Sequence, residues 1–271
     1  MPVKHTFLLV EGRHDAEFLA RLLGVRGFRP KRLLTELAGE LAGLIPRSFP
    51  VNEMIPLTTP QPVPSFYEAH GTWVSILIGG GAAAAVTLAN ALRTAARGGF
   101  QPDAIGVVID QDQHATAVLA RDAFLVEFAK QDDLPARLDF NIPPGGVPSG
   151  TPRVGLFVLP DNRQPGALED LLLECGDVNY AALKRRAEEY AEAALTQCGL
   201  TDDDLRREYG RPGGQKYLSK RKKAVVGVMG GILKPAAAVQ NSIRDNRWLE
   251  AGALALPCVK AVSAFLDELI R

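Results

Sequence analysis

Cysteine is scarce in this chain. Only three of its 271 residues are cysteines, Cys175, Cys198 and Cys258, and they form no C-x-x-C pair and have no histidine nearby in the sequence. This pattern argues against a disulfide framework and against a structural zinc site. It is typical of proteins of the reducing cytosol, so we expect a cytoplasmic location.

An excess of charge of either sign is also lacking. The 31 basic and 31 acidic residues give a formal net charge of +0 at pH 7. Binding to nucleic acid would therefore depend on a local basic patch and not on the attraction of the whole molecule.

No apolar run is long enough to suggest a membrane protein. Residues 76–92 are largely apolar, but three consecutive glycines and Asn90 interrupt them, so they are too short for a membrane span. The N-terminus has no long apolar run after basic residues, and we therefore expect no signal peptide and no membrane partner.

Short apolar runs alternate with helical patterns along most of the chain. The expected strands are 6–10, 73–78, 105–109 and 153–159, and the expected helices after them are 15–23, 82–96, 116–130 and 167–174. This alternation is typical of an α/β fold whose mainly parallel sheet is covered by helices on both faces. Connections of this length do not serve simple β-hairpins.

We expect a single domain over residues 1–271 with two elaborations. Residues 30–70 contain an insertion, because six prolines between Pro46 and Pro64 indicate irregular structure. Residues 175–250 form a helical, partly basic elaboration, in which 180–198 is amphipathic and 225–233 fits a helix or a strand equally well.

Basic residues gather in the second elaboration. They are Arg206, Arg207, Arg211, Lys216, Lys220, Arg221, Lys222 and Lys223. They would contact a phosphate backbone, with the interleaved Tyr209 and Tyr217 stacking on bases, or they would form a solvated helix face. The sequence leaves both interpretations open.

The strongest chemical signal is a pair of acidic clusters, each at the end of an apolar run. Glu11 follows residues 7–10, with Asp15 four residues further on, and Asp110 and Asp112 follow residues 105–109. In a parallel sheet, ligands and catalytic groups gather at the carboxyl ends of the strands. Carboxylates brought together there repel one another, so Mg²⁺, or Mn²⁺ in its place, is their natural partner. The clusters therefore predict metal-dependent phosphoryl transfer.

Each of these acids also has a plain structural interpretation. Glu11 suits a strand end and Asp15 a helix cap. Asp110 and Asp112 would point the same way only if the strand continued through Gln111.

Two further groups of residues also have both a functional and a structural interpretation. Glu169 and Asp170 begin a helix, where acidic side chains favour the helix dipole. Gly80 and Gly81, with Gly79 before them, precede another helix and would let a phosphate approach its N-terminus. Tight packing of the strand against the helix is the favoured role for these glycines.

Together, these segments resemble the Toprim domain of topoisomerases, primases and related nucleases. The matching parts are, in order, Leu-Leu-Val-Glu-Gly-Arg-His-Asp at 8–15, the strand–glycine–helix segment 76–91, and Val-Val-Ile-Asp-Gln-Asp at 107–112. The resemblance implies that Glu11 handles a proton or bridges metals, and that Asp110 and Asp112 bind Mg²⁺ with Asp15 assisting.

The second half of the chain is similar to an uncharacterised family of small, stand-alone, Toprim-related prokaryotic proteins, on residues 155–162 and 166–172. More distantly, it resembles the Toprim half of the overcoming-lysogenisation-defect nucleases. The resemblance implies that Glu169 and Asp170 are ligands of a second metal and that Lys223 contacts phosphate. Lys216 joins Lys223, Gly80 and Gly81 as a candidate phosphate or nucleic-acid contact.

The first hypothesis is a Mg²⁺-dependent nuclease that hydrolyses phosphodiester bonds of nucleic acid. DNA, RNA and a small phosphate ester are not distinguished. The alternative is a non-catalytic metal, phosphate or nucleic-acid binding module that acts with a partner protein. A structural subunit of a homo-oligomer is the third interpretation. The 271 residues show no topoisomerase tyrosine domain, primase zinc domain or ATPase domain, so we expect neither topoisomerase nor full primase activity.

Overall fold

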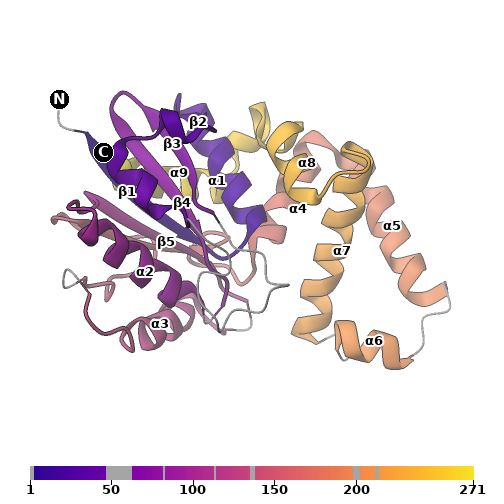
Figure 1. Ribbon diagram of the computed structural model, residues 1–271. Helices are drawn as coiled ribbons and strands as arrows, with labels where there is room; N and C mark the ends of the chain where they lie inside the picture. Colours follow the sequence, from indigo (N-terminus) through magenta and orange to yellow (C-terminus); the bar gives the residue numbers. More distant parts are fainter. Residues whose placement is uncertain are drawn as a thin grey trace. The chain divides into compact units, whose positions relative to one another are not determined.

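The computed structural model describes residues 3–46, 63–81, 83–112, 114–134, 138–197, 202–210 and 214–271, and within these residues six strands form one sheet (Figure 1). The strands are β1 (Lys4–Val10), β2 (Arg29–Lys31), β3 (Ser65–Ala69), β4 (Thr72–Ile78), β5 (Ala104–Asp110) and β6 (Arg153–Leu159). Their order across the sheet is β2-β3-β4-β1-β5-β6. Because β1 pairs in parallel with both β4 and β5, the predicted α/β class with a mainly parallel sheet is confirmed.

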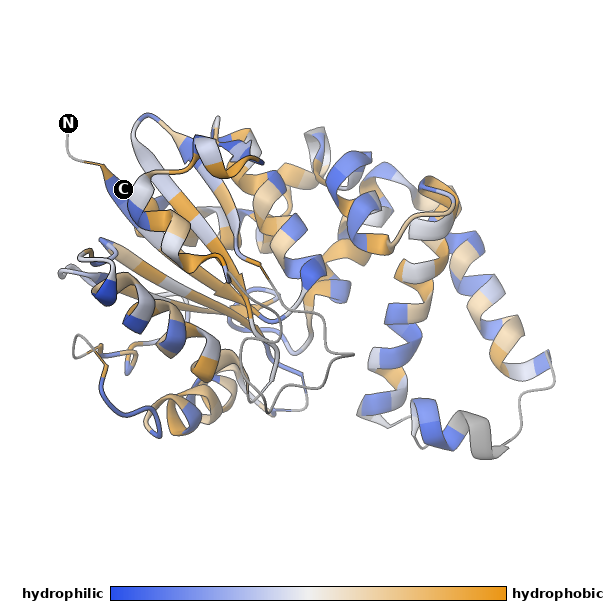
Figure 2. Ribbon diagram, viewed as in Figure 1, coloured by the Kyte–Doolittle hydropathy of each residue, from blue (hydrophilic) through white to orange (hydrophobic). Residues whose placement is uncertain are grey.

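The central strands are buried along almost their whole length, which is why they read as continuous apolar runs. β1 is buried from His5 to Val10, and β5 from Ala104 to Ile109. A strand can be buried in this way only where helices cover both faces of the sheet. Figure 2 shows the hydrophobic residues concentrated along these strands.

Two helices cover opposite faces of the sheet. Helix α1 (Arg13–Val25) connects β1 to β2 in one direction across the sheet, and α2 (Ala83–Arg97) connects β4 to β5 in the other. Crossovers between parallel strands are right-handed, so the two directions place the helices on different faces. Both helices pack against β1 and β4. The expected cover on both faces is therefore confirmed.

One edge of the sheet is antiparallel and contains a hairpin, whose first strand, β3, was not among the strands expected from the sequence. β3 and β4 are joined by the two residues His70 and Gly71, whose φ values are 50° and 78°. Positive φ at both positions is the geometry of a type I′ turn, which suits the twist of a hairpin. β2 pairs antiparallel with β3, so two strands lying within residues 29–69 extend the sheet. Residues 47–62, most of the proline-rich segment, lie outside the described residues.

The remaining helical segments include the expected C-terminal elaboration. They are the 3₁₀ turns η1 (Leu34–Glu36), η2 (Gly39–Leu44), η3 (Arg247–Leu249) and η4 (Ala251–Ala255), and the helices α3 (Ala117–Phe128), α4 (Leu168–Asn179), α5 (Ala181–Gln197), α6 (Asp202–Tyr209), α7 (Gln215–Leu233), α8 (Val239–Asp245) and α9 (Pro257–Ile270). The ambiguous segment 225–233 is helical, as part of α7. In the described part of the chain, no helix combines the length and apolar character that crossing a membrane requires.

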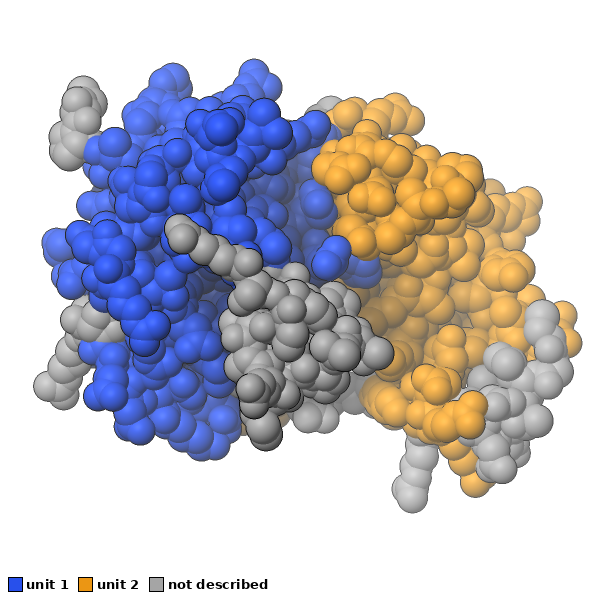
Figure 3. All heavy atoms as spheres, viewed as in Figure 1, with its two compact units in different colours: residues 1–109, 121–157, 264–271 blue, residues 110–120, 158–263 orange. Residues whose placement is uncertain are grey.

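The chain divides into two compact units (Figure 3). The first comprises residues 1–109, 121–157 and 264–271, and the second comprises residues 110–120 and 158–263. Within the second unit, α4, α5 and α7 pack against one another, and α8 packs against α7. The boundaries of the predicted single domain and of its two elaborations stay predictions.

The packing of α9 on β5 leads to a stability prediction at Gly106. A Cβ added there would overlap the Leu269 side chain and lie 2.9 Å from Leu8 Cδ1, and both leucines are fully buried. Gly106→Ala is therefore expected to lower the free energy of unfolding by about 1–3 kcal/mol, measured by denaturant titration. Gly227→Ala on α7 is the control, because its Cβ would meet nothing within 4 Å. It is expected to raise the same free energy by about 0.5–1 kcal/mol, and an equal loss at both positions would contradict this packing.

Candidate functional site

The second unit brings the end of β5 against the start of α4. Asp110, the last residue of β5, accepts a hydrogen bond at Oδ1 from the backbone N–H of Leu168, at 2.9 Å. The backbone N–H of Gln111 donates to the carbonyl oxygen of Gly166 at 3.2 Å. These two bonds hold the Asp110–Asp112 segment beside the first turn of α4. The four carboxylates of Asp110, Asp112, Glu169 and Asp170 (the acidic group) therefore belong to one local structure.

The strand does not continue through Gln111, so the condition under which Asp110 and Asp112 would point the same way is not met. β5 ends at Asp110, and Asp112 has a φ of 47°, in the left-handed region that Asp adopts more readily than most residues. The turn buries Gln111, which is 1% exposed and donates from Nε2 to the carbonyl oxygen of His114 at 2.9 Å. Asp112 itself is exposed. The physical reason is the hydrogen bond from Gln111 to Gly166, which pulls the chain out of the strand.

Glu169 is the most unusual residue of the acidic group. It is 6% exposed, and its Oε2 finds no hydrogen-bond partner among the described residues. Burial raises the pKa of Glu169 above its ordinary value, and the charges of Asp170 and Asp112 raise it further, while Lys223 acts in the opposite direction. A buried carboxylate without a partner is costly to keep ionised. Such perturbed groups cluster at functional sites.

Asp170 and Asp15 do what a helix cap does. The backbone N–H of Ala167 donates to Asp170 Oδ2 at 3.0 Å, and the backbone N–H of Gly12 donates to Asp15 Oδ2 at 2.8 Å. Each carboxylate thus satisfies a backbone donor at the start of its helix. The other oxygen of Asp170, Oδ1, forms an ion pair with Lys222. Both oxygens of Asp170 are therefore engaged.

In the first unit, Glu11 and the glycines meet where β1 and β4 end. The backbone N–H of Gly79 donates to the Val10 carbonyl oxygen at 2.9 Å. A Cβ at Gly80 would lie 3.0 Å from the carbonyl oxygen of Glu11, and one at Gly79 would lie 2.7 Å from Thr87 Cβ. A side chain at Gly79 would overlap Thr87, and one at Gly80 would be crowded by the backbone of Glu11, so close packing favours glycine at both positions, the role preferred from the sequence. The phosphate role of Gly80 and Gly81 stays a prediction.

The predicted site residues fall in both units. Glu11, Asp15, Gly80 and Gly81 belong to the first, and Asp110, Asp112, Glu169, Asp170, Lys216 and Lys223 belong to the second. Within the second unit, the charge of Lys223 acts on Glu169, whereas Lys216 lies about two turns away along α7.

The acidic group offers suitable ligands for Mg²⁺, although they are not yet arranged as a cage. Among the described residues, no three His, Cys, Asp or Glu side chains are placed as they stand to hold a metal ion. Mg²⁺ needs no such cage, because it commonly takes one or two carboxylates and completes its shell with water and substrate phosphate. The unpartnered Oε2 of Glu169 and the exposed carboxylate of Asp112 supply those two. The chemistry of these oxygen ligands suits Mg²⁺, and metal binding at the acidic group stays a prediction.

Sequence reasoning missed Gln111 and Lys222. Gln111 was read only as the residue between two aspartates, and nothing in its own segment signals that its Oε1 is buried without a hydrogen-bond partner among the described residues. Lys222 was only one of a run of basic residues. Its pairing with Asp170 depends on how α7 packs against α4.

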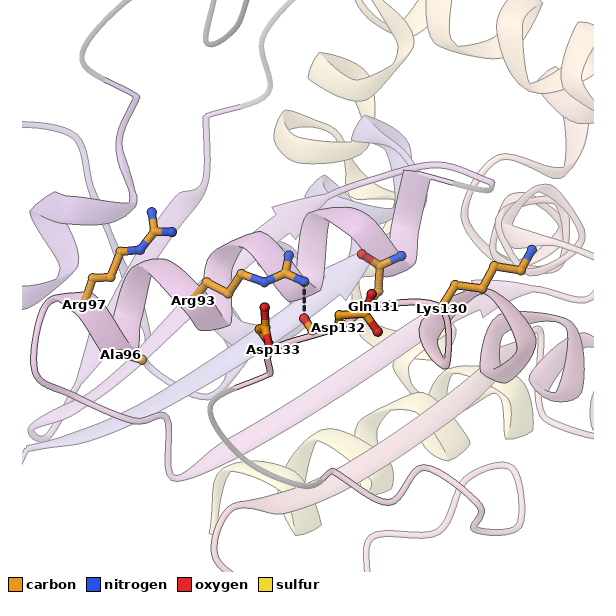
Figure 4. A pocket seen from close by; sticks show the side chains of 7 residues that line it. All are labelled: Arg93, Ala96, Arg97, Lys130, Gln131, Asp132 and Asp133. Carbon is orange, nitrogen blue, oxygen red and sulfur yellow. Dashed lines mark hydrogen bonds between the residues drawn. The ribbon is translucent and has the colours of Figure 1, made fainter.

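A polar cavity of about 580 Å³ in the first unit was also missed (Figure 4). Its lining residues are Arg93, Ala96, Arg97, Lys130, Gln131, Asp132 and Asp133. Arg93 and Arg97 project from neighbouring turns of α2, and Arg93 Nη2 donates to the Asp132 carbonyl oxygen at 2.5 Å. Lys130 pairs with Glu127 at 2.6 Å. Because the lining carries both signs of charge, and Arg93 and Lys130 already have partners, we assign it no chemistry.

The comparison with protein families decides where the chain belongs. The family model described as "Protein of unknown function (DUF3226)" matches residues 5–225. The chain is a member of the DUF3226 family. The part that DUF3226 matches contains every candidate site residue from Glu11 to Lys223 and ends within α7.

The structure of this DUF3226 protein is similar to the crystal structure of a hypothetical protein from Pyrococcus horikoshii OT3. The two share 17% sequence identity and superpose with a TM-score of 0.51, over 98% of this chain and 95% of the archaeal one. At this identity, the likeness establishes a shared fold. Comparison with curated proteins gives no match.

Proposed function

We propose that this DUF3226 protein is a Mg²⁺-dependent phosphoryl-transfer enzyme, a nuclease that hydrolyses phosphodiester bonds. The observation that carries the proposal is Glu169, a buried carboxylate with an oxygen that has no hydrogen-bond partner among the described residues. The charges of Asp170, Asp112 and Lys223 act on its pKa. Burying an ionised carboxylate without a partner destabilises a fold. A bound cation, which also contacts a substrate phosphate, would compensate for that destabilisation. The resemblance to Toprim nucleases supports the same chemistry.

The residues of the acidic group have different roles in this proposal. Glu169 and Asp112 hold the metal, and Asp110, fixed by the Leu168 N–H, adds negative charge to the site. Lys223 offers a positive charge to the substrate phosphate. Bound Mg²⁺ or Mn²⁺ would neutralise the phosphate and lower the pKa of an attacking water. Glu11 is the proton-handling acid implied by the Toprim resemblance, while Asp15 and Asp170 keep their capping contacts.

A binding module is the second candidate function. It is favoured by the absence, among the described residues, of three metal-ligating side chains already placed together. In that case, the acidic group holds a metal and a phosphate ligand, and any reaction requires a partner protein. We also propose a cytoplasmic location, because Cys175 and Cys258 are free thiols.

The test of the proposed function is a cleavage screen of the purified protein. Labelled single-stranded and duplex DNA and RNA, and a small phosphodiester, are incubated with Mg²⁺, Mn²⁺ or EDTA. We expect products with either metal and none with EDTA. A thermal melt with the same metals runs in parallel, because a ligand that binds the folded state raises the melting temperature.

The screen separates the three hypotheses. Cleavage with metal supports the nuclease. A metal-dependent rise in melting temperature without cleavage of any substrate would contradict the nuclease and favour the binding module. No response of either kind would favour a structural subunit.

A further inference from the structure

Helix α7 carries a line of exposed lysines on one face. Lys216, Lys220 and Lys223 are exposed and follow one another at intervals of four and three residues (the α7 stripe). Residues at these intervals lie one above the other on a helix. With a rise of 1.5 Å per residue, the stripe extends about 10 Å along the helix axis. Figure 2 shows the first turns of α7 as largely hydrophilic.

The stripe begins at the acidic group. The charge of Lys223 acts on Glu169, and Lys222, the neighbouring residue on α7, forms an ion pair with Asp170. The ion pair and the packing of α4 against α7 place the middle of α7 beside the first turn of α4, within the second unit. Lys220 and Lys216 then lie about one and two turns further from the carboxylates.

The other end of the stripe meets a pair of aromatic rings. Tyr209 of α6 and Tyr217 of α7 have ring centroids 6.1 Å apart at an interplanar angle of 55°, and both side chains are partly exposed. Lys216 Nζ donates to the carbonyl oxygen of Arg207 at 3.0 Å, which ties α6 to α7 at this point. Arg206 and Arg207 are themselves exposed on α6. Aromatic and basic side chains therefore stand together here.

This combination fits one kind of polyanion. A row of lysines tracks a phosphate backbone, and aromatic rings stack on bases that are not held in a duplex. An acidic peptide would pair with the lysines but has no bases to stack on the tyrosine rings. A duplex would present its phosphates while keeping its bases away from the rings.

We infer that the α7 stripe binds the backbone of a single-stranded nucleic acid and leads it toward the acidic group. The binding stands on the stripe and the tyrosine pair alone, and the delivery of a phosphate to the carboxylates rests on the proposed function. The strand would run along α7 from Tyr209 and Tyr217 past Lys220 to Lys223. Single-stranded nucleic acid is thus the substrate class of the proposed nuclease.

The test measures binding without catalysis. Fluorescence anisotropy of labelled single-stranded DNA and RNA is recorded in EDTA for the full chain and for Lys216→Gln/Lys220→Gln. We expect the double variant to bind at least about 10-fold more weakly, and the slope of log affinity against log salt to fall by about 1.4, or 0.7 for each lost phosphate contact. Lys4→Gln/Lys260→Gln removes the same charge from exposed positions elsewhere and is expected to change neither quantity.

Tyr217→Leu tests the stacking. It keeps an apolar side chain beside Tyr209 but removes a ring, so we expect about 5- to 150-fold weaker binding with an unchanged salt slope. Thermal melts check that each variant is folded.

The outcomes distinguish this inference from the proposed function. Weaker binding by the stripe variant supports the inference even where the wild type cleaves nothing, a result that would overturn the nuclease. Wild-type binding by the stripe variant would overturn the inference even where the protein cleaves. Duplex bound more tightly than single strands, or full competition by poly-glutamate, would overturn the assignment of a single strand.

Discussion

Asp110→Asn combined with Asp112→Asn is expected to lower metal-dependent cleavage by about 100-fold or more without unfolding the protein. Even groups behind metal ligands cost 10–100-fold when changed, and this variant removes two charges from the acidic group itself. Asn keeps the Oδ1 acceptor that Asp110 presents to Leu168 at 2.9 Å. Asn also tolerates the left-handed backbone of Asp112, where φ is 47°. The measurement is the initial cleavage rate with Mg²⁺.

A variant with the same change of net charge controls for long-range electrostatics. Asp177 pairs with Lys184 and Asp267 pairs with Arg26, both outside the acidic group. Asp177→Asn with Asp267→Asn is expected to cleave at the wild-type rate. If the Asp110 and Asp112 variant also cleaved at that rate with the same metal requirement, the acidic group would not be the reaction centre.

Glu169→Gln is expected to stabilise the protein at neutral pH and to remove its response to metal. The change replaces a buried carboxylate, whose ionised form is disfavoured by burial and by the charges of Asp170 and Asp112, with an uncharged amide of the same shape; Oε2 of the carboxylate has no hydrogen-bond partner among the described residues. A buried charge is more costly than a buried amide, so a gain of about 1 kcal/mol is expected. For a chain of this size, the melting temperature should rise by about 2–4 °C for each kcal/mol. Added Mg²⁺ should then raise the melting temperature of the wild type alone.

The stabilisation should depend on pH with a defined sign. Burial raises the pKa of Glu169 above its ordinary value of 4.5, so the unfolded chain releases this proton at a lower pH than the folded protein does. The contribution of Glu169 to wild-type stability therefore falls as the pH rises from about 4.5 toward its folded pKa, and the advantage of Glu169→Gln grows over that window. Melts at pH 4 and pH 7 measure the difference.

Glu68→Gln provides a control of opposite sign. The N–H of Gly71 donates to Glu68 Oε1 at 3.1 Å, and this hydrogen bond lowers the pKa of Glu68. Its ionised form therefore stabilises the fold above the unfolded pKa, and the stabilisation is lost as the pH falls. Glu68→Gln should destabilise the protein at pH 7 and lose that effect in acid. A stabilised Glu68→Gln, or a destabilised Glu169→Gln, would contradict the assigned environments.

The sequence predicted the centre of the sheet well because its signal is local. β1, β4 and β5 are buried on both faces, so each appears as an apolar run whose ends were placed within two residues. The edge strands were missed for the opposite reason. β2 has only three residues, and all are at least partly exposed. For β3, the local signal is the two-residue turn at His70 and Gly71 that follows it.

The candidate site was predicted only in part, because several of its contacts join residues that are far apart in the sequence. The strand-end position of Asp110 and Asp112 is visible in their own segment. The turn that buries Gln111 depends on the carbonyl oxygen of Gly166, more than fifty residues away in the sequence. The burial of Glu169 and the pairing of Lys222 depend on the packing of α4 and α7. No pattern within one segment contains that information.

The division of the chain into two units has a practical consequence for genetic dissection. The polypeptide passes from one unit to the other four times, after residues 109, 120, 157 and 263. Neither unit is thus encoded by one continuous stretch of the gene, and both chain ends belong to the first. A truncation at any single position would remove part of both units or leave one of them incomplete. Individual codon changes, and not deletions, are the route by which the acidic group and the α7 stripe can be separated.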